Sequence, residues 1–267
     1  MPPADSLLTI DKAAVASRFN RSAETYDDHC RVQRLMADRL VVCLEGVAAP
    51  ARILELGCGT GYLTSLLASR FPASKIVALD FAERMVEVAR NRVRGSLVDL
   101  DVADAESADF DPESFDLIVS NATIQWFDTP AGSLARLASA LRPGGLMLHS
   151  TFGPGTFAEL RSVLRTDGLP LRPADRWRSM LQDAGLTAGL CTTGRVTVTY
   201  PSAAGFLAEL RATGATWRPN GSDGPPLPPG LLRSALARYD AEFAAPGGVP
   251  VTYELLVVSG TRPGKTI

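Results

Sequence analysis

Three glycines, at positions 57, 59 and 61, stand in the run Glu55-Leu-Gly-Cys-Gly-Thr-Gly61. Such a loop lets the backbone turn tightly and approach a ligand without clashes from Cβ atoms. It is neither a dinucleotide fingerprint, whose third glycine would stand where this chain has Tyr62, nor a phosphate-binding loop, because the terminal Lys-Ser/Thr is missing. The carboxylate of Glu55 disfavours phosphate and favours a cationic ligand.

Further polar residues close the apolar runs that follow the loop. Asp80 ends the second run, where a carboxylate can accept hydrogen bonds from both hydroxyls of a ribose. Asp104 follows the third run, where it can accept from an adenine amino group, and Asn121 ends the fourth. Because ligands of open α/β sheets bind at the carboxyl ends of the strands, these residues predict an adenosine pocket with an acidic wall.

Each residue also has a simpler interpretation. The glycines could serve tight packing alone, Asp80 could cap the helix that follows it, and Asp104 could belong to a turn. Glu55 is harder to explain in this way, because a carboxylate beside an apolar core needs a partner.

The elements that position these residues alternate between strand and helix. Apolar runs predict strands at 52–56, 75–80, 96–102, 115–121 and 146–150, and helical spacing predicts helices at 62–70, 83–94 and 133–141. The segment 142–145, Arg-Pro-Gly-Gly, predicts a turn. This alternation is typical of an α/β fold with a doubly wound, mostly parallel sheet.

The flanks are less regular. Residues 11–45 are predicted to be helical in two pieces, broken near Asn20 or near Asp27. Beyond residue 151, helices are expected at 157–165, 173–184 and 231–243, strands at 195–200 and 251–259, and an exposed loop at 219–230. We therefore divide the chain into a helical lid (1–45) and a main domain (46–267), with a cofactor half (51–150) and a substrate-shaping half (151–267).

Composition narrows the class of protein. The chain has 267 residues, 46% of them hydrophobic, which suits one large domain. The net charge of −2 gives no reason to expect nucleic acid as a partner. No apolar run approaches the roughly 20 residues that span a membrane, and the N-terminus does not resemble a secretory signal. The four cysteines lack disulfide or metal spacing, so we expect a cytoplasmic protein without a metal.

Taken together, the glycine run, Asp80, Asp104-Ala-Glu, the segment FDLIVSN at 115–121 and LRPGGLM at 141–147 resemble the class I S-adenosylmethionine-dependent methyltransferases. The resemblance implies a Rossmann-like fold with a seven-stranded sheet, an N-terminal helical lid and small C-terminal insertions. It implies S-adenosylmethionine as the cofactor and S-adenosylhomocysteine as the product. The cofactor-binding residues it implies are Gln33, Glu55, Gly57, Cys58, Gly59, Gly61, Asp80, Phe81, Met85, Asp104, Ala105 and Asn121.

Four flanking segments are similar to the malonyl-acyl-carrier-protein O-methyltransferases of biotin biosynthesis. They lie at 11–33, 120–126, 214–216 and 249–254. The resemblance implies methylation of the free carboxylate of a malonyl group on acyl-carrier protein. That acceptor is already ionised at neutral pH, so no general base is needed, which suits a chain with only His29 and His149. Trp217 and the loop at 222–229 depart from the family pattern.

Three residues are predicted to act as catalytic residues beside the acceptor. Tyr26 and His29, three positions apart, would share one face of a helix laid over the pocket, and Trp126 would stand at its mouth beside the sulfonium. Ordinary packing is the alternative for each. Trp217 and Tyr253 are secondary candidates.

The sequence does not identify the arginine that faces the acceptor carboxylate; Arg18, Arg21 and Arg142 are candidates. The arginines between positions 161 and 178 could dock an acidic carrier protein, or simply form a solvated helix face.

Other functions remain open at this stage. A methyltransferase with the same core could act on another small carboxylic acid or on a hydroxyl group. A non-catalytic S-adenosylmethionine-binding protein would keep the same acidic positions. A nicotinamide oxidoreductase is disfavoured by Tyr62.

Overall fold

The computed structural model describes residues 10–93, 97–164, 171–215 and 228–264. The expected alternation of strand and helix is present. Seven strands form one sheet: β1 (Arg52–Leu56), β2 (Lys75–Asp80), β3 (Val98–Val102), β4 (Phe115–Asn121), β5 (Leu141–Phe152), β6 (Thr187–Tyr200) and β7 (Val249–Thr261).

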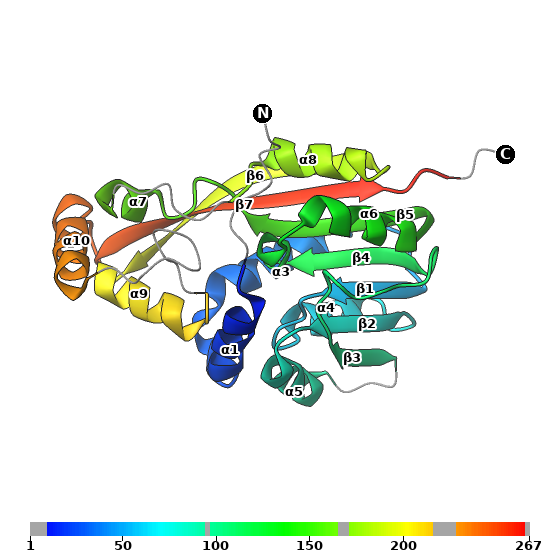
Figure 1. The fold of residues 1–267 in the computed structure, drawn as a ribbon, viewed down its shortest axis with the longest axis horizontal. Coiled ribbons are helices and arrows are strands. Elements are labelled where there is room, and N and C mark those ends of the chain that lie inside the picture. The colour runs from blue at the N-terminus through cyan, green and yellow to red at the C-terminus, as the bar shows by residue number, and fades with distance from the viewer. Residues whose placement is uncertain (1–9, 94–96, 165–170, 216–227, 265–267) are drawn as a thin grey trace.

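The order of the strands is β3-β2-β1-β4-β5-β7-β6. The first five are parallel, and β7 runs antiparallel to both β5 and β6. The chain leaves β1 toward β2 on one side, and β4 lies on the other, so the switch in strand order falls beside β1. In Figure 1 the carboxyl ends of the parallel strands all point to one edge of the sheet. The prediction of a doubly wound, mostly parallel, seven-stranded sheet is confirmed.

Alternation of side chains along the strands supplies two apolar layers. Leu54 and Ile118 join the core packed by the helices α6 (Pro130–Ala140) and α8 (Ala174–Asp183). Their neighbours Ile53 and Leu117 join the core on the opposite face, packed by α3 (Arg31–Val42), α4 (Tyr62–Arg70) and α5 (Glu83–Arg92). Such double coverage explains why the strands read as nearly continuous apolar runs.

From α6 onward the structure departs from the prediction in several places. The expected turn at 142–145 is an irregularity within β5, because Leu141 pairs with Phe115 and Leu146 with Leu117, while Gly144, at a φ of +80°, and Gly145 bond Arg262. α6 begins at Pro130, which is preferred in the first turn of a helix. β6 is longer than the predicted 195–200, and the helix α9 (Ala203–Ala212) was not predicted.

The C-terminal half builds a second region beyond the sheet edge. β6 and β7 extend past the other strands toward α7 (Ala158–Leu164), α9 and α10 (Pro229–Glu242), as Figure 1 shows. Their apolar side chains form a core of their own around Phe157, Phe206 and Tyr239. Most of the predicted loop at 219–230 lies outside the described residues, and its last two residues belong to α10.

The N-terminal region forms three helices rather than two pieces. These are α1 (Lys12–Ser22), the single turn α2 (Tyr26–His29) and α3. α1 lies at the carboxyl edge of the sheet, between the parallel strands and α9 (Figure 1). Within the described ranges, none of the helices combines the length and the apolar character required to cross a membrane.

Candidate active site

Two cavities lie at the carboxyl edge of the sheet, and Gly57 lines both. The smaller, of about 280 Å³, includes among its lining residues Gly57, Asp80, Phe81, Asp104, Ala105 and Trp126. The larger, of about 420 Å³, includes Tyr26, Gln33, Glu55, Gly57, Cys58, Gly59 and Asn121. The structure therefore gathers most of the predicted site residues, whereas His29, Gly61 and Met85 line neither cavity.

The three glycines of the loop have positive φ angles and three different environments. A Cβ atom on Gly57 would lie 2.1 Å from Oγ1 of Thr123, and one on Gly61 would lie 3.0 Å from the Cβ of Ala89 in α5. These two glycines permit close packing within the protein. Gly59 has no atom within 4 Å of such a Cβ and lines the larger cavity. It is the glycine that leaves room for a ligand.

Glu55 lines the larger cavity. Its side chain is buried, and Oε2 has no hydrogen-bond partner in the described part of the chain. Burial raises the pKa of this carboxyl to about 7; the hydroxyl of Thr64 opposes the shift, and the charge of Asp80 adds to it. An orphaned carboxylate oxygen in a cavity suits a cationic group of a ligand.

Asp80 joins the glycine loop to the start of α5. Its Oδ2 accepts from the backbone N–H of Gly59 at 2.9 Å, and Oδ1 accepts from that of Ala82 at 2.8 Å. Burial raises its pKa to about 6 despite these two bonds. The cap interpretation is not borne out, because Ala82 is the N-cap residue of α5 and that helix has no side-chain cap; Asp80 bonds the N–H of Ala82 instead. The side chain also lines the smaller cavity, so its predicted role in ribose binding stays open as a prediction.

The two cavities share Gly57 and together are called the groove below; aromatic side chains contribute to both. The ring of Phe19 in α1 lies 6.3 Å from Tyr26, 6.3 Å from Phe81 and 6.0 Å from Trp126. Met85 is buried in the same apolar cluster, beneath α1 rather than in a cavity wall. Burial raises the pKa of the Tyr26 hydroxyl, and the neighbouring Cys30, Asp80 and Asp27 add to the shift. Tyr26 therefore stays protonated over the ordinary pH range.

α2 is fixed to the loop side of the groove through Asp27. Its Oδ1 accepts from the hydroxyl of Thr60 at 2.8 Å, and Oδ2 pairs with the guanidinium of Arg92 in α5. Arg34 lies 3.4 Å from the same carboxylate, with its guanidinium over the ring of Tyr62. Although burial alone would raise the pKa of Asp27, these bonds and charges hold it below its ordinary value.

The polar residues of α3 and β4 are tied to each other. The side-chain amide of Asn121 donates to the carbonyl of Gln33 at 2.9 Å and accepts from the hydroxyl of Ser150 at 2.6 Å. Asn121 thus links the N-terminal helices to the sheet. His29 ends the single turn of α2, which is too short to present the continuous face that the prediction assumed.

Several secondary predictions fall away from the groove. Arg142 pairs with Asp116 near the amino-terminal ends of the strands. Arg172 is buried over the ring of Trp177, so the arginines of this segment do not form a single solvated face. Tyr253 is buried with its hydroxyl 2.9 Å from that of Tyr200. Trp217 lies outside the described residues.

Comparison with known proteins decides the family. A model of a methyltransferase domain matches residues 53–145. The malonyl-[acyl-carrier protein] O-methyltransferase of Paenibacillus sp. (strain JDR-2) is 33% identical over 276 residues, which cover 92% of this chain and 98% of the relative. The Bacillus cereus protein of the same name is 35% identical, and the alignment covers 96% of this chain and 99% of that relative. This chain belongs to the S-adenosylmethionine-dependent methyltransferases.

Solved methyltransferases share the fold. A methyltransferase from Bacillus halodurans superimposes with a TM-score of 0.61 at 16% identity, over 84% of this chain and 97% of that structure. A Haemonchus contortus phosphoethanolamine N-methyltransferase in complex with S-adenosyl-L-methionine gives a TM-score of 0.54 at 19% identity. The superposition covers 85% of this chain and 52% of that structure. At such identities the likeness establishes the class I fold alone.

The residues of this methyltransferase fit the cofactor of its family. The orphaned oxygen of Glu55 offers a partner to a cationic group, and Gly59 leaves backbone space beside it. Arg34 contributes a buried Nε that has no partner among the described residues, which suits a carboxylate. The described residues contain no group of three or more His, Cys, Asp or Glu side chains able to hold a metal ion.

Sequence reasoning missed several residues of this site. Lys12, Thr123 and Arg34 line the cavities, and Thr60 anchors α2. One signal for Lys12 was available: it is the first residue of a helix, where a positive charge opposes the helix dipole. A lysine there needs a partner elsewhere in the fold.

Proposed function

We propose that this enzyme transfers a methyl group to the free carboxylate of a malonyl group on acyl-carrier protein, giving the methyl ester used in biotin biosynthesis. The observation that carries the proposal is the extent of the similarity. Identity of 33–35% to malonyl-[acyl-carrier protein] O-methyltransferases runs over more than nine tenths of the chain. An alignment of this length extends well beyond residues 53–145, the part that the methyltransferase-domain model matches. Such an enzyme would work in the cytoplasm.

The chemistry of the groove supports an acceptor that is already ionised. S-adenosylmethionine, when bound, supplies an electrophilic methyl group on a sulfonium. A malonyl carboxylate has an ordinary pKa of about 4, so it needs no base at neutral pH. The structure matches this, because His149 lies beside Trp177, away from both cavities, with its pKa lowered to about 3 by burial.

The protein would then contribute enclosure and orientation. Phe19, Tyr26 and Trp126 would exclude water from the groove, and their ring faces favour a nearby cation. We retain Tyr26 and Trp126 as proposed catalytic residues and propose no catalytic role for His29.

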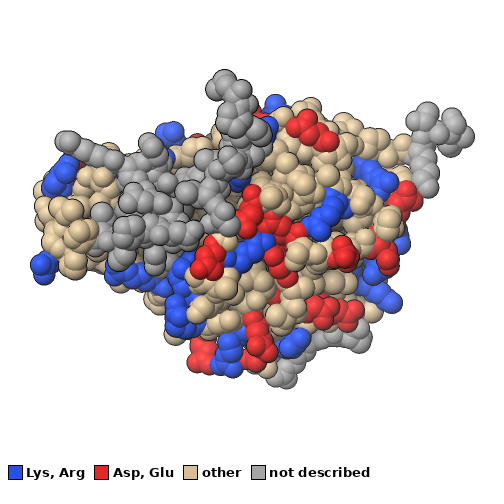
Figure 2. Space-filling view, viewed as in Figure 1, with Lys and Arg blue, Asp and Glu red and all other residues tan. Residues whose placement is uncertain are grey.

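The charge distribution suits a carrier-protein partner. On the face that Figure 2 shows, several Arg and Lys side chains are visible toward the end that carries α9 and α10, although these two helices themselves hold three arginines and three acidic residues, and both signs mix over the sheet. An acidic carrier protein would be steered to the former surface. Arg161 belongs to the same end of the molecule, because its helix α7 packs against α10, whereas Arg176 and Arg178 lie in α8, which packs against α6.

Mass spectrometry of malonyl-acyl-carrier protein, after incubation with enzyme and S-adenosylmethionine, tests the proposal. We expect a gain of one methyl group, no gain on acetyl-carrier protein, which lacks the free carboxylate, and weak turnover of malonyl-pantetheine, which lacks the carrier. Tyr26→Phe should slow turnover, and Tyr239→Phe, far from both cavities, is the matched control. An unmodified malonyl-carrier protein together with methylation of a small acid or alcohol would refute the acceptor. Cofactor binding with no methyl transfer to any acceptor would refute catalysis.

A further inference from the structure

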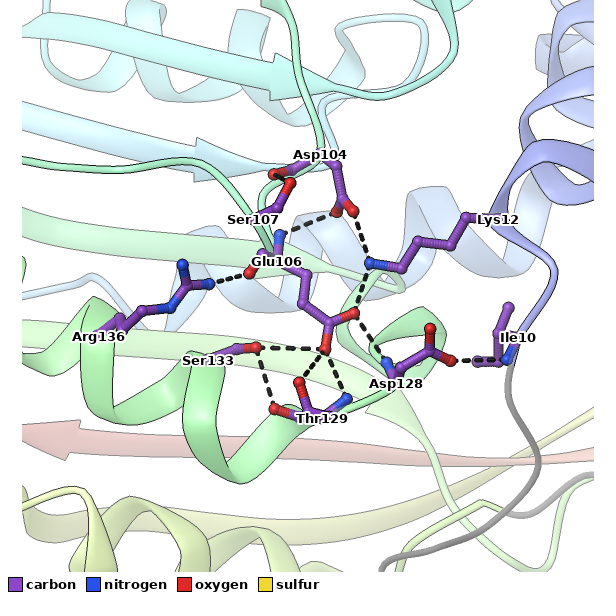
Figure 3. Close-up of polar contacts among 9 residues, drawn as sticks. All are labelled: Ile10, Lys12, Asp104, Glu106, Ser107, Asp128, Thr129, Ser133 and Arg136. Atoms are coloured by element: carbon purple, nitrogen blue, oxygen red, sulfur yellow. Dashed lines mark hydrogen bonds and ion pairs between the residues drawn. The ribbon is translucent and has the colours of Figure 1, made fainter.

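The first turn of α1 reaches the wall of the smaller cavity through Lys12. Its Nζ lies 2.6 Å from Oδ2 of Asp104 and 2.5 Å from Oε2 of Glu106 (Figure 3). Lys12 also lines the cavity itself. The lysine therefore connects the N-terminal region to the segment after β3, which is the expected adenine side of the groove.

Lys12 serves this contact rather than its own helix. Asp11 already caps α1, accepting from the backbone N–H of Ala14 at 2.9 Å, whereas a lysine at the first position is opposed by the helix dipole. Partial burial alone would lower the pKa of Lys12, but its bonds to Asp104 and Glu106 raise it above the ordinary value. The ammonium is thus held as a cation between two carboxylates.

Glu106 gives the lysine a rigid partner. Its buried carboxylate also accepts from the backbone N–H groups of Asp128 at 2.8 Å and Thr129 at 2.5 Å, just before α6. A second bond joins the same frame, because the N–H of Ile10 donates to Oδ1 of Asp128 at 2.6 Å (Figure 3). The start of α1 therefore docks on a surface that is fixed by the sheet and α6.

Asp104 is fixed by the same arrangement. Its Oδ1 accepts from the N–H of Glu106 at 2.9 Å, and its Oδ2 accepts from Lys12. Each carboxylate oxygen can accept a further hydrogen bond. The carboxylate is held in one orientation at the cavity wall, with capacity left for a donor of a ligand.

We propose that Lys12 is a positioning residue for cofactor binding, which orients Asp104 toward the adenine amino group while it docks α1 over that end of the groove. Adenine recognition and closure of the N-terminal region are then one coupled event. The inference rests on the placement of the cofactor in these cavities and is independent of the acceptor.

Binding of S-adenosylhomocysteine to Lys12→Met by calorimetry tests this. We expect the dissociation constant to rise by up to about fivefold. 5′-Methylthioadenosine, which lacks the amino-acid part, should lose the same factor, because the contact is at the adenine end. The matched control is Lys75→Met, which removes the same charge at an exposed position at the start of β2. Binding by this control should equal that of the wild type.

Hydrogen exchange of the ligand-free protein supplies the second measurement. Residues 12–22 should exchange faster in Lys12→Met, while the strands keep their protection, so a general loss of folding would be recognised. Lys12→Arg keeps the cation and should retain most of the affinity. The proposal is wrong if Lys12→Met binds both ligands as the wild type does, or if only S-adenosylhomocysteine is weakened. Failure to methylate malonyl-carrier protein would leave these binding results unaffected.

Discussion

The N-terminal region is attached to the two ends of the cofactor groove with opposite charge arrangements. At the larger cavity, the carboxylate of Asp27 reaches out from α2 to Thr60 and Arg92. At the smaller cavity, the ammonium of Lys12 reaches from α1 to carboxylates that follow β3. The N-terminal region therefore contacts the core through the anion of Asp27 at one cavity and through the cation of Lys12 at the other.

We distinguish a contact that holds the N-terminal region in place, called the anchor, from a contact whose strength depends on bound cofactor, called the ligand-sensing contact. Thr60 and Arg92 belong to the glycine loop and α5, and neither is a predicted partner of the cofactor. Asp104 is such a partner, so Lys12 shares its target with the ligand. We infer that the Asp27 end holds the N-terminal region in place whether or not cofactor is bound, whereas docking at the Lys12 end strengthens with the cofactor.

The largest expected effect comes from breaking the anchor. Asp27→Ala removes a charge-assisted bond to Arg92 and the bond to Thr60, and it leaves the guanidinium without this partner. We expect the free energy of unfolding to fall by about 2 kcal/mol, measured by urea denaturation. Asp28→Ala is the matched control, because Asp28 is the exposed neighbour on the same turn. Equal stabilities for the two variants would remove the distinction between anchor and ligand-sensing contact.

The pH dependence of cofactor binding tests the carboxyl groups that line the two cavities, Glu55 in the larger and Asp80 in the smaller. The pKa values of Glu55 and Asp80 are raised to about 7 and about 6. Because folding raises the pKa of these two carboxyl groups, their protonated forms stabilise the ligand-free fold at low pH. This contribution to the free energy of unfolding is lost as the pH rises through 6 and 7. A cationic cofactor instead binds the ionised carboxylates, so its affinity should rise with pH over this window, by up to about tenfold per unit for one group.

Calorimetry with S-adenosylmethionine at several pH values measures this dependence. Glu55→Gln removes the group with the higher pKa and should flatten the curve near pH 7. A wild-type affinity that is constant from about pH 5.5 to pH 7.5 would show that neither carboxyl titrates on binding.

The smallest expected effect is that of salt on the two ends. Lys12 is 27% exposed and Asp27 is 23% exposed, so salt reaches both ion pairs, and the Lys12 pair is worth at most about 1 kcal/mol. Asp27 also accepts a hydrogen bond from the uncharged hydroxyl of Thr60, which salt screens less. Raising the salt concentration should therefore speed hydrogen exchange in α1 by a few-fold and in α2 by less. Equal responses at both ends would contradict the assignment of Asp27 as the stronger attachment.

The core of the fold was predictable because its signals are local. Strands β1, β2 and β4 and the loop from Gly57 to Gly61 follow directly from apolar runs and glycine spacing. The different environments of the glycines were not predictable, because Thr123 and Ala89 reach them only through tertiary packing.

The covering of the site was predicted only in part. Tyr26 and Trp126 reach the groove, but α2 is one turn long and His29 does not follow them. The pair of Lys12 with Asp104 joins residues 92 positions apart, a separation that sequence periodicity does not encode.

The place of β7 in the sheet has a consequence for the order of folding. Among the described residues, β6 pairs with β7 alone, and β7 inserts between β5 and β6 although it comes later in the chain than either. During synthesis, β6 must therefore wait without a partner strand until the segment Val249–Thr261 has emerged. Because pairings between distant segments form slowly, we expect the region around α9 and α10 to acquire its structure after the cofactor half. A chain released before Val249 would leave the backbone of β5 unpaired on the side that β7 covers in the complete protein.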